Sequence, residues 1–558
     1  MDIGSTIRKY ALQNAVQFKG KANPGTIVGK LMGEDPNIKS QMKEIMPQIQ
    51  TIVAEVNAMN PDDQKQALGE IDPTLLEKNK KEKREFTLPD LKTNDKPVIM
   101  RFAPNPNGPL SFGHARQVML NWWYVQKYKG TFILRFDDTD PRTKIPMKEA
   151  YDLIEQDIAW LGVHPNTVVK QSERFDLYYG FAEELIKQGK AYVDTEDAEV
   201  MRELLRKGEP SKDRDLPAEE HLKRWHMMHD PKGGYKDGQA VLRIKTDLKH
   251  KNPAVRDWPA FRIITDGKHP LKEAKVWPLL NFSSAIDDHE LGVTHIIRGI
   301  DLSVSDERQQ LLYEHFGWEY PQTRYTGKLL IEGIKSTSES RKLIESGELI
   351  GWDDIRLGTI MTLKRRGYTP EAIHEFVKSV GLNKNNVNVS LETVAAFNKD
   401  ILDKKSDRFF FIKDPKEITI NNAPTQEVAL ELHPEIERGK RIFHTSNAFV
   451  LDTEDVNAFK KGQLIRLMDC LNFEVQESYE FKSLSYDDYK KDGAAIIHWL
   501  PKDETIPVTV LMPDNTSIEG LGEVRLKDLN TDTVIQLERF GFCRVDSTDP
   551  LILWYSHD

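Results

Sequence analysis

The chain has very little cysteine and no long apolar run. Its two cysteines, Cys470 and Cys543, are too few for a disulfide framework or a cysteine-rich zinc module. No apolar stretch approaches the roughly 18 residues of a membrane span. The first ten residues, MDIGSTIRKY, lack the hydrophobic core of a signal peptide. We therefore expect a cytoplasmic protein that has no membrane partner and binds no zinc.

The sequence also lacks the excess of basic residues that is usual in nucleic-acid-binding proteins. It has 78 Lys and Arg against 88 Asp and Glu, so its formal net charge is −10, which by itself argues against a polyanionic partner. Basic residues nevertheless gather locally: residues 242–262 hold six basic and two acidic side chains, and 364–366 and 438–441 are further basic clusters. Because phosphate contacts need local patches rather than a basic total, a nucleic-acid partner is not excluded.

The length and the N-terminal pattern indicate several domains. A chain of 558 residues predicts about three to four domains. Residues 1–85 carry apolar side chains at helical spacing, as at Ile45, Ile49 and Val53, which predicts a helical appendage. It ends in the charged run KNKKEKR at 78–84, for which a solvated linker is favoured over an RNA-facing patch.

The next part of the chain has the pattern of a parallel βαβ unit. Two short apolar runs typical of buried strands each precede a helical pattern; in chain order these segments are 97–103, 114–129, 131–136 and 148–161. Ligands bind at the carboxyl ends of the strands in such sheets. The loops after the two strands, 104–113 and 137–141, are therefore the expected place of a site.

The later chain changes character three times. A charged, glycine-interrupted stretch looks like an insertion into the parallel-sheet domain, whose pattern resumes at 292–301. A helical region follows, and from about residue 408 short strands suggest one or two β-barrels. We predict an α/β protein with these parts: a helical appendage 1–95, a parallel-sheet domain 96–195 and 278–330, an insertion 196–277, a helical region 331–405, and a β-barrel region 406–558.

The stretch RFAPNPNGPLSFGHAR at 101–116 has the chemistry of a phosphate site. Gly113 lets a ligand approach the backbone closely, and the start of the following helix offers free N–H groups and a positive dipole end. His114 adds a further donor. Taken alone, the same residues also fit an ordinary tight turn with a capping histidine.

The pattern P-x-P-N-G-x-L-x-x-G-H-A in this stretch resembles the "HIGH" signature of class I aminoacyl-tRNA synthetases, in the glutamyl/glutaminyl version. Further stretches agree in order and spacing: RFDDTDP at 135–141, VRDWPAFRI at 255–263, GWDDIRLGTIMTLKRRGYTPEAI at 351–373, and IIHWLP at 496–501 with LERFGFCRVD at 537–546. The resemblance covers roughly residues 95–558. The chain is similar to the archaeal-type glutamyl enzymes of this family.

The resemblance implies a two-step reaction, in which L-glutamate and ATP form glutamyl-adenylate and pyrophosphate, and the adenylate then acylates tRNA(Glu). It also implies a Rossmann-type catalytic domain, an acceptor-end-binding insertion, a helical stem-contact region, anticodon-binding β-barrels and Mg²⁺. The ATP-binding loop that it assigns is Pro104, Pro106, Asn107, Gly108, Gly113 and His114; the catalytic residues are Ser111, His114, Lys335, Ser336 and Ser338; the tRNA-binding residues are Arg256, Lys364, Arg365 and Arg366.

Glutamate must be held at both ends. Arg101, at the end of the first strand, matches the family's arginine for the side-chain carboxylate, which a guanidinium fork binds in two places. Asp137 matches the acceptor for the α-ammonium, and Arg298 matches an arginine that contacts the substrate carboxylate in glutamyl enzymes. For each of these charged residues, an internal salt bridge is the alternative interpretation.

The pocket residues favour glutamate over glutamine. Glutaminyl enzymes carry a Tyr-x-x-x-His pair where this chain has Leu280 and Ser284, a further substrate-binding position, and a neutral residue where it has Arg298. An added cation favours the charged substrate, because the amide would leave that charge unpaired. The acidic Asp287 and Asp288 are expected to fix local structure rather than bind metal, since consecutive side chains do not converge on one ion.

Two positions depart from the family. Ser111 replaces the first histidine of "HIGH", which leaves a hydroxyl donor. Glu339 stands where the second signature, "KMSKS", usually has a basic residue, so Lys335 or Arg341 is expected to supply the cation from a shifted position. A glutaminyl enzyme, a non-catalytic tRNA-binding relative and a small-acid adenylyltransferase stay open as alternatives. Charging of tRNA(Gln) also stays open, and oligomeric state has no signal.

Overall fold

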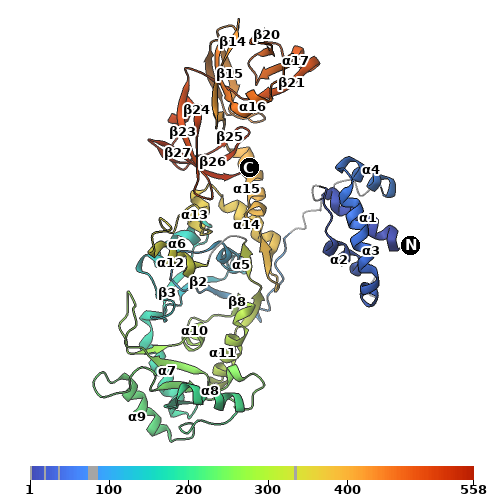
Figure 1. Ribbon diagram of the computed structural model, residues 1–558. Helices are drawn as coiled ribbons and strands as arrows, with labels where there is room; N and C mark the ends of the chain where they lie inside the picture. The colour runs from blue at the N-terminus through green and yellow to red at the C-terminus, as the bar shows by residue number, and fades with distance from the viewer. Residues whose placement is uncertain (1–2, 18–19, 35–37, 73–85, 332–335) are drawn as a thin grey trace. The chain divides into compact units, whose positions relative to one another are not determined.

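The computed structural model describes residues 3–17, 20–34, 38–72, 86–331 and 336–558. The charged run 78–84 and Lys335 lie outside the described residues. The chain divides into two compact units, Met1–Thr87 and Leu88–Asp558 (Figure 1), and each is described by itself. Within the described ranges, no helix is both long enough and apolar enough to cross a membrane.

The first unit is helical, as its apolar spacing predicts. Its helices, drawn in blue in Figure 1, are α1 (Ile3–Gln17), α2 (Pro24–Glu34), α3 (Ile38–Ala58) and α4 (Pro61–Ile71). Their apolar faces share one core, to which Ile27, Ile49 and Leu68 belong. The buried Gln64 side-chain NH2 donates to three backbone carbonyls, whereas its Oε1 has no hydrogen-bond partner among the described residues.

The second unit begins with a five-stranded parallel sheet. In spatial order its strands are β3 (Thr167–Lys170), β2 (Thr131–Phe136), β1 (Ile99–Phe102), β8 (His295–Gly299) and β9 (Gln322–Thr326). All four pairings are parallel, and the predicted strand at 131–136 is confirmed. The chain runs outward from β1 on one side and returns at β8 on the other, and such a switch point is where parallel sheets bind ligands.

Two helices follow the first two strands, as the pattern predicts. They are α5 (Phe112–Tyr128) and α6 (Lys148–Trp160). Helix α5 begins two residues earlier than the spacing suggests, because Ser111 takes the N-cap position with extended backbone. The glycine-bearing end of the loop 104–113 therefore lies in the first helical turn.

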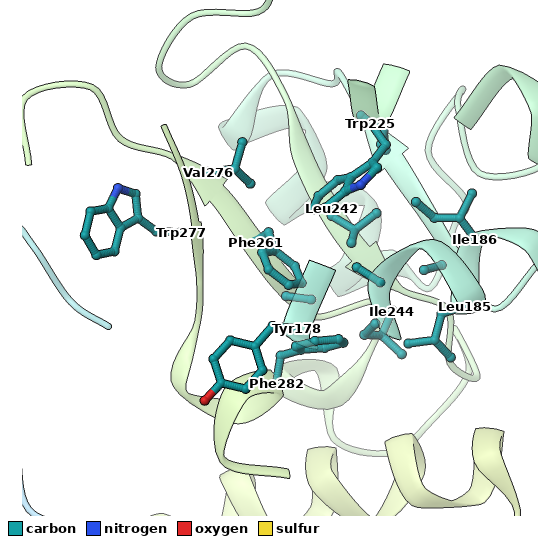
Figure 2. Close-up of a cluster of buried hydrophobic side chains, with 14 of the residues drawn as sticks. Tyr178, Leu185, Ile186, Trp225, Leu242, Ile244, Phe261, Val276, Trp277 and Phe282 are labelled. Atoms are coloured by element: carbon teal, nitrogen blue, oxygen red, sulfur yellow. The ribbon is translucent and has the colours of Figure 1, made fainter. Parts of the chain in front are cut away.

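The insertion forms its own antiparallel sheet, and it begins before the predicted boundary at residue 196, because residues between 175 and 194 belong to its core and its sheet. Its strands are β4 (Ala191–Asp194), β5 (Val241–Ile244), β6 (Pro259–Ile263) and β7 (Val276–Pro278), and its helices are α7 (Phe175–Lys187), α8 (Ala198–Lys207) and α9 (Ala218–His229). Figure 2 shows part of its core, in which the centroid of the Phe261 ring lies 5.1 Å from that of Trp225 and 4.8 Å from that of Phe282. Phe282 belongs to α10 (Leu280–Glu290), so this core fixes the helix that carries the predicted pocket residues.

A helical region follows the parallel sheet. Helix α11 (Ser303–Phe316) precedes it and connects β8 to β9 of that sheet. The elements of the helical region are β10 (Leu329–Ile331), α12 (Thr337–Glu345), α13 (Ile360–Arg365), α14 (Pro370–Val380), β11 (Val387–Val389) and α15 (Leu391–Lys405). Strands β10 and β11 pair in parallel. Strand β11, near the end of the region, thus lies beside β10, which directly precedes the "KMSKS"-like segment.

From residue 408 the chain is mostly strands, as predicted. One seven-stranded sheet contains β12 (Arg408–Phe409), β25 (Val534–Leu537), β26 (Gly541–Thr548), β27 (Leu551–His557), β23 (Thr505–Leu511), β24 (Ser517–Glu523) and β13 (Phe411–Ile412). The other contains β21 (Gly493–Ile497), β18 (Leu464–Leu467), β19 (Asn472–Val475), β20 (Tyr479–Ser483), β14 (Pro415–Asn421), β17 (Ala448–Asp452) and β22 (Leu500–Pro501). The remaining elements are the hairpin β15 (Gln426–Glu431) and β16 (Lys440–Thr445) with helices α16 (Thr453–Ala458) and α17 (Tyr486–Asp492).

Candidate active site

A cavity of about 1200 Å³ opens at the carboxyl ends of β1, β2 and β8. Its lining combines residues that follow these strands with the first turns of α5 and α10 and with strands β5 and β6 of the insertion. Both loops expected to form a site contribute to it. Predicted site residues that line the cavity are Arg101, Pro104, Ser111, Gly113, His114, Asp137, Ser284 and Arg298.

Arg101 is part of a buried charge network. Its Nε and Nη2 donate to the two oxygens of Asp288 at 3.0 and 3.2 Å, and Arg135 Nη1 donates to Asp288 at 2.7 Å. Burial alone would raise the pKa of Asp288, but Arg101 and Arg135 outweigh it and lower the pKa to about 2. Asp288 therefore stays ionised and holds the Arg101 guanidinium in a fixed orientation at the cavity wall.

The same network positions Asp137. Arg135 Nε donates to Asp137 Oδ1 at 2.7 Å, and the Ser284 hydroxyl donates to Asp137 Oδ2 at 3.0 Å. The structure thus brings Arg101, Asp137 and Ser284 together in one connected set of side chains. Arg101 and Asp137 form internal ion pairs and also line the cavity. An internal salt bridge and substrate binding are therefore compatible roles for these residues.

Arg298 reaches the cavity from the end of β8. Its Nη1 donates to Gln309 at 2.9 Å and lies 3.4 Å from Asp306. Its Nε is buried and has no hydrogen-bond partner among the described residues. A buried N–H without an acceptor is unfavourable, and Arg298 as a whole lines the cavity.

At the start of α5, the His114 ring has a defined proton arrangement. The Ser111 backbone N–H donates to His114 Nδ1 at 3.1 Å. Burial lowers the His114 pKa to about 4, and the positive charge of Lys144 acts in the same direction. The ring is therefore neutral near pH 7 with its proton on Nε2, and this N–H is a donor for a phosphate oxygen beside the helix N-terminus.

The loop that carries Ser111 and His114 is held from behind by groups that the sequence did not single out. Asp157 of α6 accepts a hydrogen bond from Leu110 N–H at 2.9 Å. The Leu110 carbonyl accepts from Ile360 N–H at 2.8 Å, and Phe112 N–H donates to the Gly358 carbonyl at 2.9 Å. The loop is thereby paired, backbone to backbone, with the segment that starts α13.

Three residues assigned to the ATP-binding loop do not line the cavity: Pro106, Asn107 and Gly108. Gly108 has a packing role. A Cβ atom there would lie 2.7 Å from Thr337 Cγ2 and 2.9 Å from the Trp352 ring, closer than side-chain carbons approach. The absence of a side chain at Gly108 lets α12 pack against the loop.

The described residues of the "KMSKS"-like segment also lie outside the cavity lining. The Ser336 hydroxyl caps α12 by accepting from Glu339 N–H at 3.3 Å, and Ser338 is exposed in the first turn. Arg341, which is expected to supply a cation from a shifted position, donates to the Ile145 carbonyl at 3.0 Å and to Glu345 at 2.9 Å.

The four residues assigned to tRNA binding have different surroundings. Arg256 donates to three backbone carbonyls inside the insertion. Arg365 forms a two-bond ion pair with Asp546 of β26, and the buried Arg366 donates to carbonyls of β27. Lys364 is exposed. Two of the four therefore join α13 to the C-terminal sheets.

Comparison with known proteins agrees with this architecture. The family model for the catalytic domain of class I tRNA synthetases (E and Q) matches residues 97–404, and two models for the anticodon-binding domain of the same class match 406–486 and 496–546. The chain belongs to the class I tRNA synthetases of the E and Q group.

Within that class, full-length relatives of this chain include glutamate–tRNA ligases. The chain is 45% identical to the glutamate–tRNA ligase of Pyrococcus abyssi, with 100% of both chains covered, and 44% identical to that of Pyrococcus furiosus, with the same coverage. A crystal structure of a glutamate tRNA ligase from Elizabethkingia meningosepticum in complex with its amino acid is 24% identical, covering 55% of this chain and 69% of that chain with a TM-score of 0.39.

Proposed function

We propose that this chain attaches L-glutamate to tRNA(Glu) through a glutamyl-adenylate. The observation that carries the proposal is the set of charges at the cavity: Arg101 and Arg298 offer donors for carboxylates, and Asp137 offers an acceptor for an ammonium group. A glutamate has these three charges, and charge-assisted hydrogen bonds are the strong ones. The full-length similarity to glutamate–tRNA ligases supports the same substrate.

In the first step, an oxygen of the glutamate α-carboxylate attacks the α-phosphorus of ATP. The bond from that phosphorus to the bridging oxygen breaks, and pyrophosphate leaves with the electron pair. No proton needs to move, so the chain contributes orientation and charge stabilisation. The Nε2–H of His114, beside the positive dipole end of α5, is the donor available for phosphate oxygens. A terminal ribose hydroxyl of tRNA then displaces AMP from the acyl carbon.

Mg²⁺ commonly accompanies ATP and keeps several water ligands of its own. Among the described residues, no group of three His, Cys, Asp or Glu side chains is placed to hold a metal ion. The residues present do not form a protein site for this ion, and no step above is assigned to it.

Specificity for glutamate rests on Arg298. A glutamine side chain would leave the positive charge of Arg298 at the cavity without a matching anion, and an unpaired charge disfavours the wrong substrate strongly. A non-catalytic relative would have no need for this arrangement of amino-acid-binding charges. Charging of tRNA(Gln) with glutamate depends on the anticodon and acceptor contacts, and the proposal does not include it. The charging experiment below tests it.

Pyrophosphate exchange tests the proposal directly. Glutamate-dependent exchange is expected in the presence of tRNA(Glu), with glutamine inactive at the same concentration. Arg101→Ala should abolish exchange and leave tRNA affinity within a few fold, because Arg101 lies at the amino-acid end of the cavity. Absence of glutamate-dependent exchange with and without tRNA would contradict the catalytic proposal. Charging of purified tRNA(Glu) and tRNA(Gln) in parallel then shows whether both are substrates.

A further inference from the structure

The cavity is lined by nine Lys and Arg side chains among the described residues. Seven of them already have partners: five pair with carboxylates and two donate to backbone carbonyls. The two without such partners in the described part of the chain are Lys144 and Arg262. A cationic side chain that lines the cavity without a partner in the chain is the group most able to bind an anionic ligand.

The two free cations belong to different parts of the cavity. Arg262 is on strand β6 of the insertion. Lys144 is in the loop after β2 and is exposed, and its positive charge lowers the pKa of the His114 ring. Lys144 also lines the same cavity as Ser111, Gly113 and His114 at the start of α5.

The loop around Lys144 is fixed while its side chain is left free. The Asp140 carboxylate accepts from Arg142 N–H at 3.1 Å and from Thr143 N–H at 2.8 Å. On the other side, Arg341 of α12 donates to the Ile145 carbonyl at 3.0 Å. The backbone is thus held on both sides of Lys144, which reduces the entropy lost when its ammonium binds an anion.

We propose that Lys144 is a further catalytic residue, whose ammonium binds the triphosphate of ATP and stabilises the charge that develops on the departing pyrophosphate. No proton is transferred in this step; the electron pair of the broken phosphorus–oxygen bond goes to pyrophosphate. Only the catalytic part of this proposal rests on the proposed function; the binding of ATP by Lys144 does not. The proposal also bears on Glu339: where the second signature usually has a basic residue this chain has an acidic one, and Lys144 adds a cation from the loop after β2.

Equilibrium binding of ATP and of adenosine tests the contact without glutamate or tRNA. Calorimetry is done on the full-length wild type, Lys144→Met, Lys144→Arg, and Lys148→Met, which removes an exposed lysine at the start of α6 outside the cavity lining. Lys144→Met should raise the ATP Kd about tenfold and leave the adenosine Kd within twofold. Lys144→Arg should retain most of the ATP affinity, and Lys148→Met should change neither Kd.

Pyrophosphate exchange tests the catalytic part with the same proteins. Lys144→Met should lower the maximal rate about 100-fold with the glutamate KM within twofold. Equal ATP affinity in all four proteins, or a parallel loss of ATP and adenosine affinity in Lys144→Met, would overturn the Lys144 proposal. Lys144-dependent ATP binding in a wild type that shows no glutamate-dependent exchange would instead overturn the proposed function.

Discussion

The carboxylate of Asp157 and the backbone N–H of Leu110 are joined by a buried hydrogen bond of 2.9 Å. Burial raises the pKa of Asp157 to about 7, although the Leu110 N–H and the charge of Lys364 act in the opposite direction. A carboxyl group that changes protonation near neutral pH therefore stands behind the loop that presents Ser111 and His114.

Asp157→Asn should remove a pH dependence of stability. The folded-state pKa lies above the ordinary value of 3.8, so the folded chain binds more protons than the unfolded chain between these two values. The stability from this group is present below about pH 4 and is lost as the pH rises toward 7. Asparagine keeps an acceptor for Leu110 and has no charge, so at pH 8 it should stabilise the protein by about 2 kcal/mol or more.

Urea unfolding at pH 5 and pH 8 measures this difference. The advantage of Asp157→Asn should be clearly larger at pH 8 than at pH 5. Asp157→Ala is the control, because it leaves the Leu110 N–H without an acceptor and should be less stable than Asp157→Asn by about 1–3 kcal/mol at both pH values. An Asp157→Asn protein whose stability difference from wild type does not change with pH would contradict the role of this carboxyl.

Asp288→Asn should be strongly destabilising. The change leaves the buried Arg101 and Arg135 without their shared carboxylate, and breaking a buried pair typically costs about 3–5 kcal/mol. Because the Asp288 pKa is lowered to about 2, the stability it gives is present above the ordinary value and is lost as the pH falls toward 2.

Glu454→Gln is the matched control for Asp288→Asn. Glu454 pairs with Lys413 in a largely exposed ion pair, so the loss should stay below about 1 kcal/mol. Urea unfolding near pH 7 compares the two variants. Similar small losses in both would show that the Asp288 network does not hold the Arg101 guanidinium.

Arg365→Lys should weaken the junction between α13 and the C-terminal sheets. Arg365 donates to both oxygens of Asp546 at 2.8 Å and stacks on the Trp554 ring at 3.9 Å. Lysine keeps the charge but loses the fork and the stacking, for an expected loss of about 1–2 kcal/mol in thermal or urea unfolding. The tRNA affinity of the Arg365→Lys protein should change only slightly.

Lys364→Ala is the opposite case. Its side chain is exposed, so the variant should unfold like the wild type but bind tRNA more weakly in a filter-binding assay, with a smaller dependence on salt. Normal stability with strongly reduced tRNA affinity in Arg365→Lys would reverse the assignment and make Arg365 the RNA contact.

Gly108→Ala should impair exchange through crowding, and Thr337→Ser should partly restore it. The added Cβ meets Thr337 Cγ2 at 2.7 Å, and serine lacks that methyl group. We expect a loss of about 1–3 kcal/mol in stability for Gly108→Ala with a clear drop in pyrophosphate exchange, and a smaller loss in the double variant. Thr337→Ser alone is the control, and additive effects of the two changes would contradict the contact.

The periodic parts of the fold were predictable from the sequence because their burial is regular. The strand 131–136 is buried along most of its length, so an uninterrupted apolar run marks it. Asp157 carried a similar signal: it lies between Ile154, Ile158 and Leu161 at helical spacing, and an acidic residue on an apolar stripe is expected to be buried. The pattern alone does not give its partner, which is 47 residues away.

The partners of cations were not predictable. Arg256, Arg365 and Arg366 stand in basic clusters that resemble RNA-facing patches, yet their donors go to carbonyls and carboxylates of the chain. Charge and spacing do not distinguish these cases, because the acceptors come from distant segments. The proposed role of Lys144 was not predictable either. The hydrogen bonds that fix its loop come partly from Arg341, which is distant in the sequence, so no local pattern shows that the Lys144 side chain has no partner among the described residues.

Arg101 and Arg298 differ in how readily mutation could replace them. Asp306, beside Arg298, also accepts hydrogen bonds from three hydroxyl groups, so it keeps donors if Arg298 is lost. Within the described residues, the side-chain bonds of Asp288 are to arginines alone. Asp288 would keep only Arg135 if Arg101 were lost. The evolutionary freedom to change the amino-acid substrate is therefore uneven, because a substitution at position 298 removes fewer of its carboxylate partner's bonds than one at position 101.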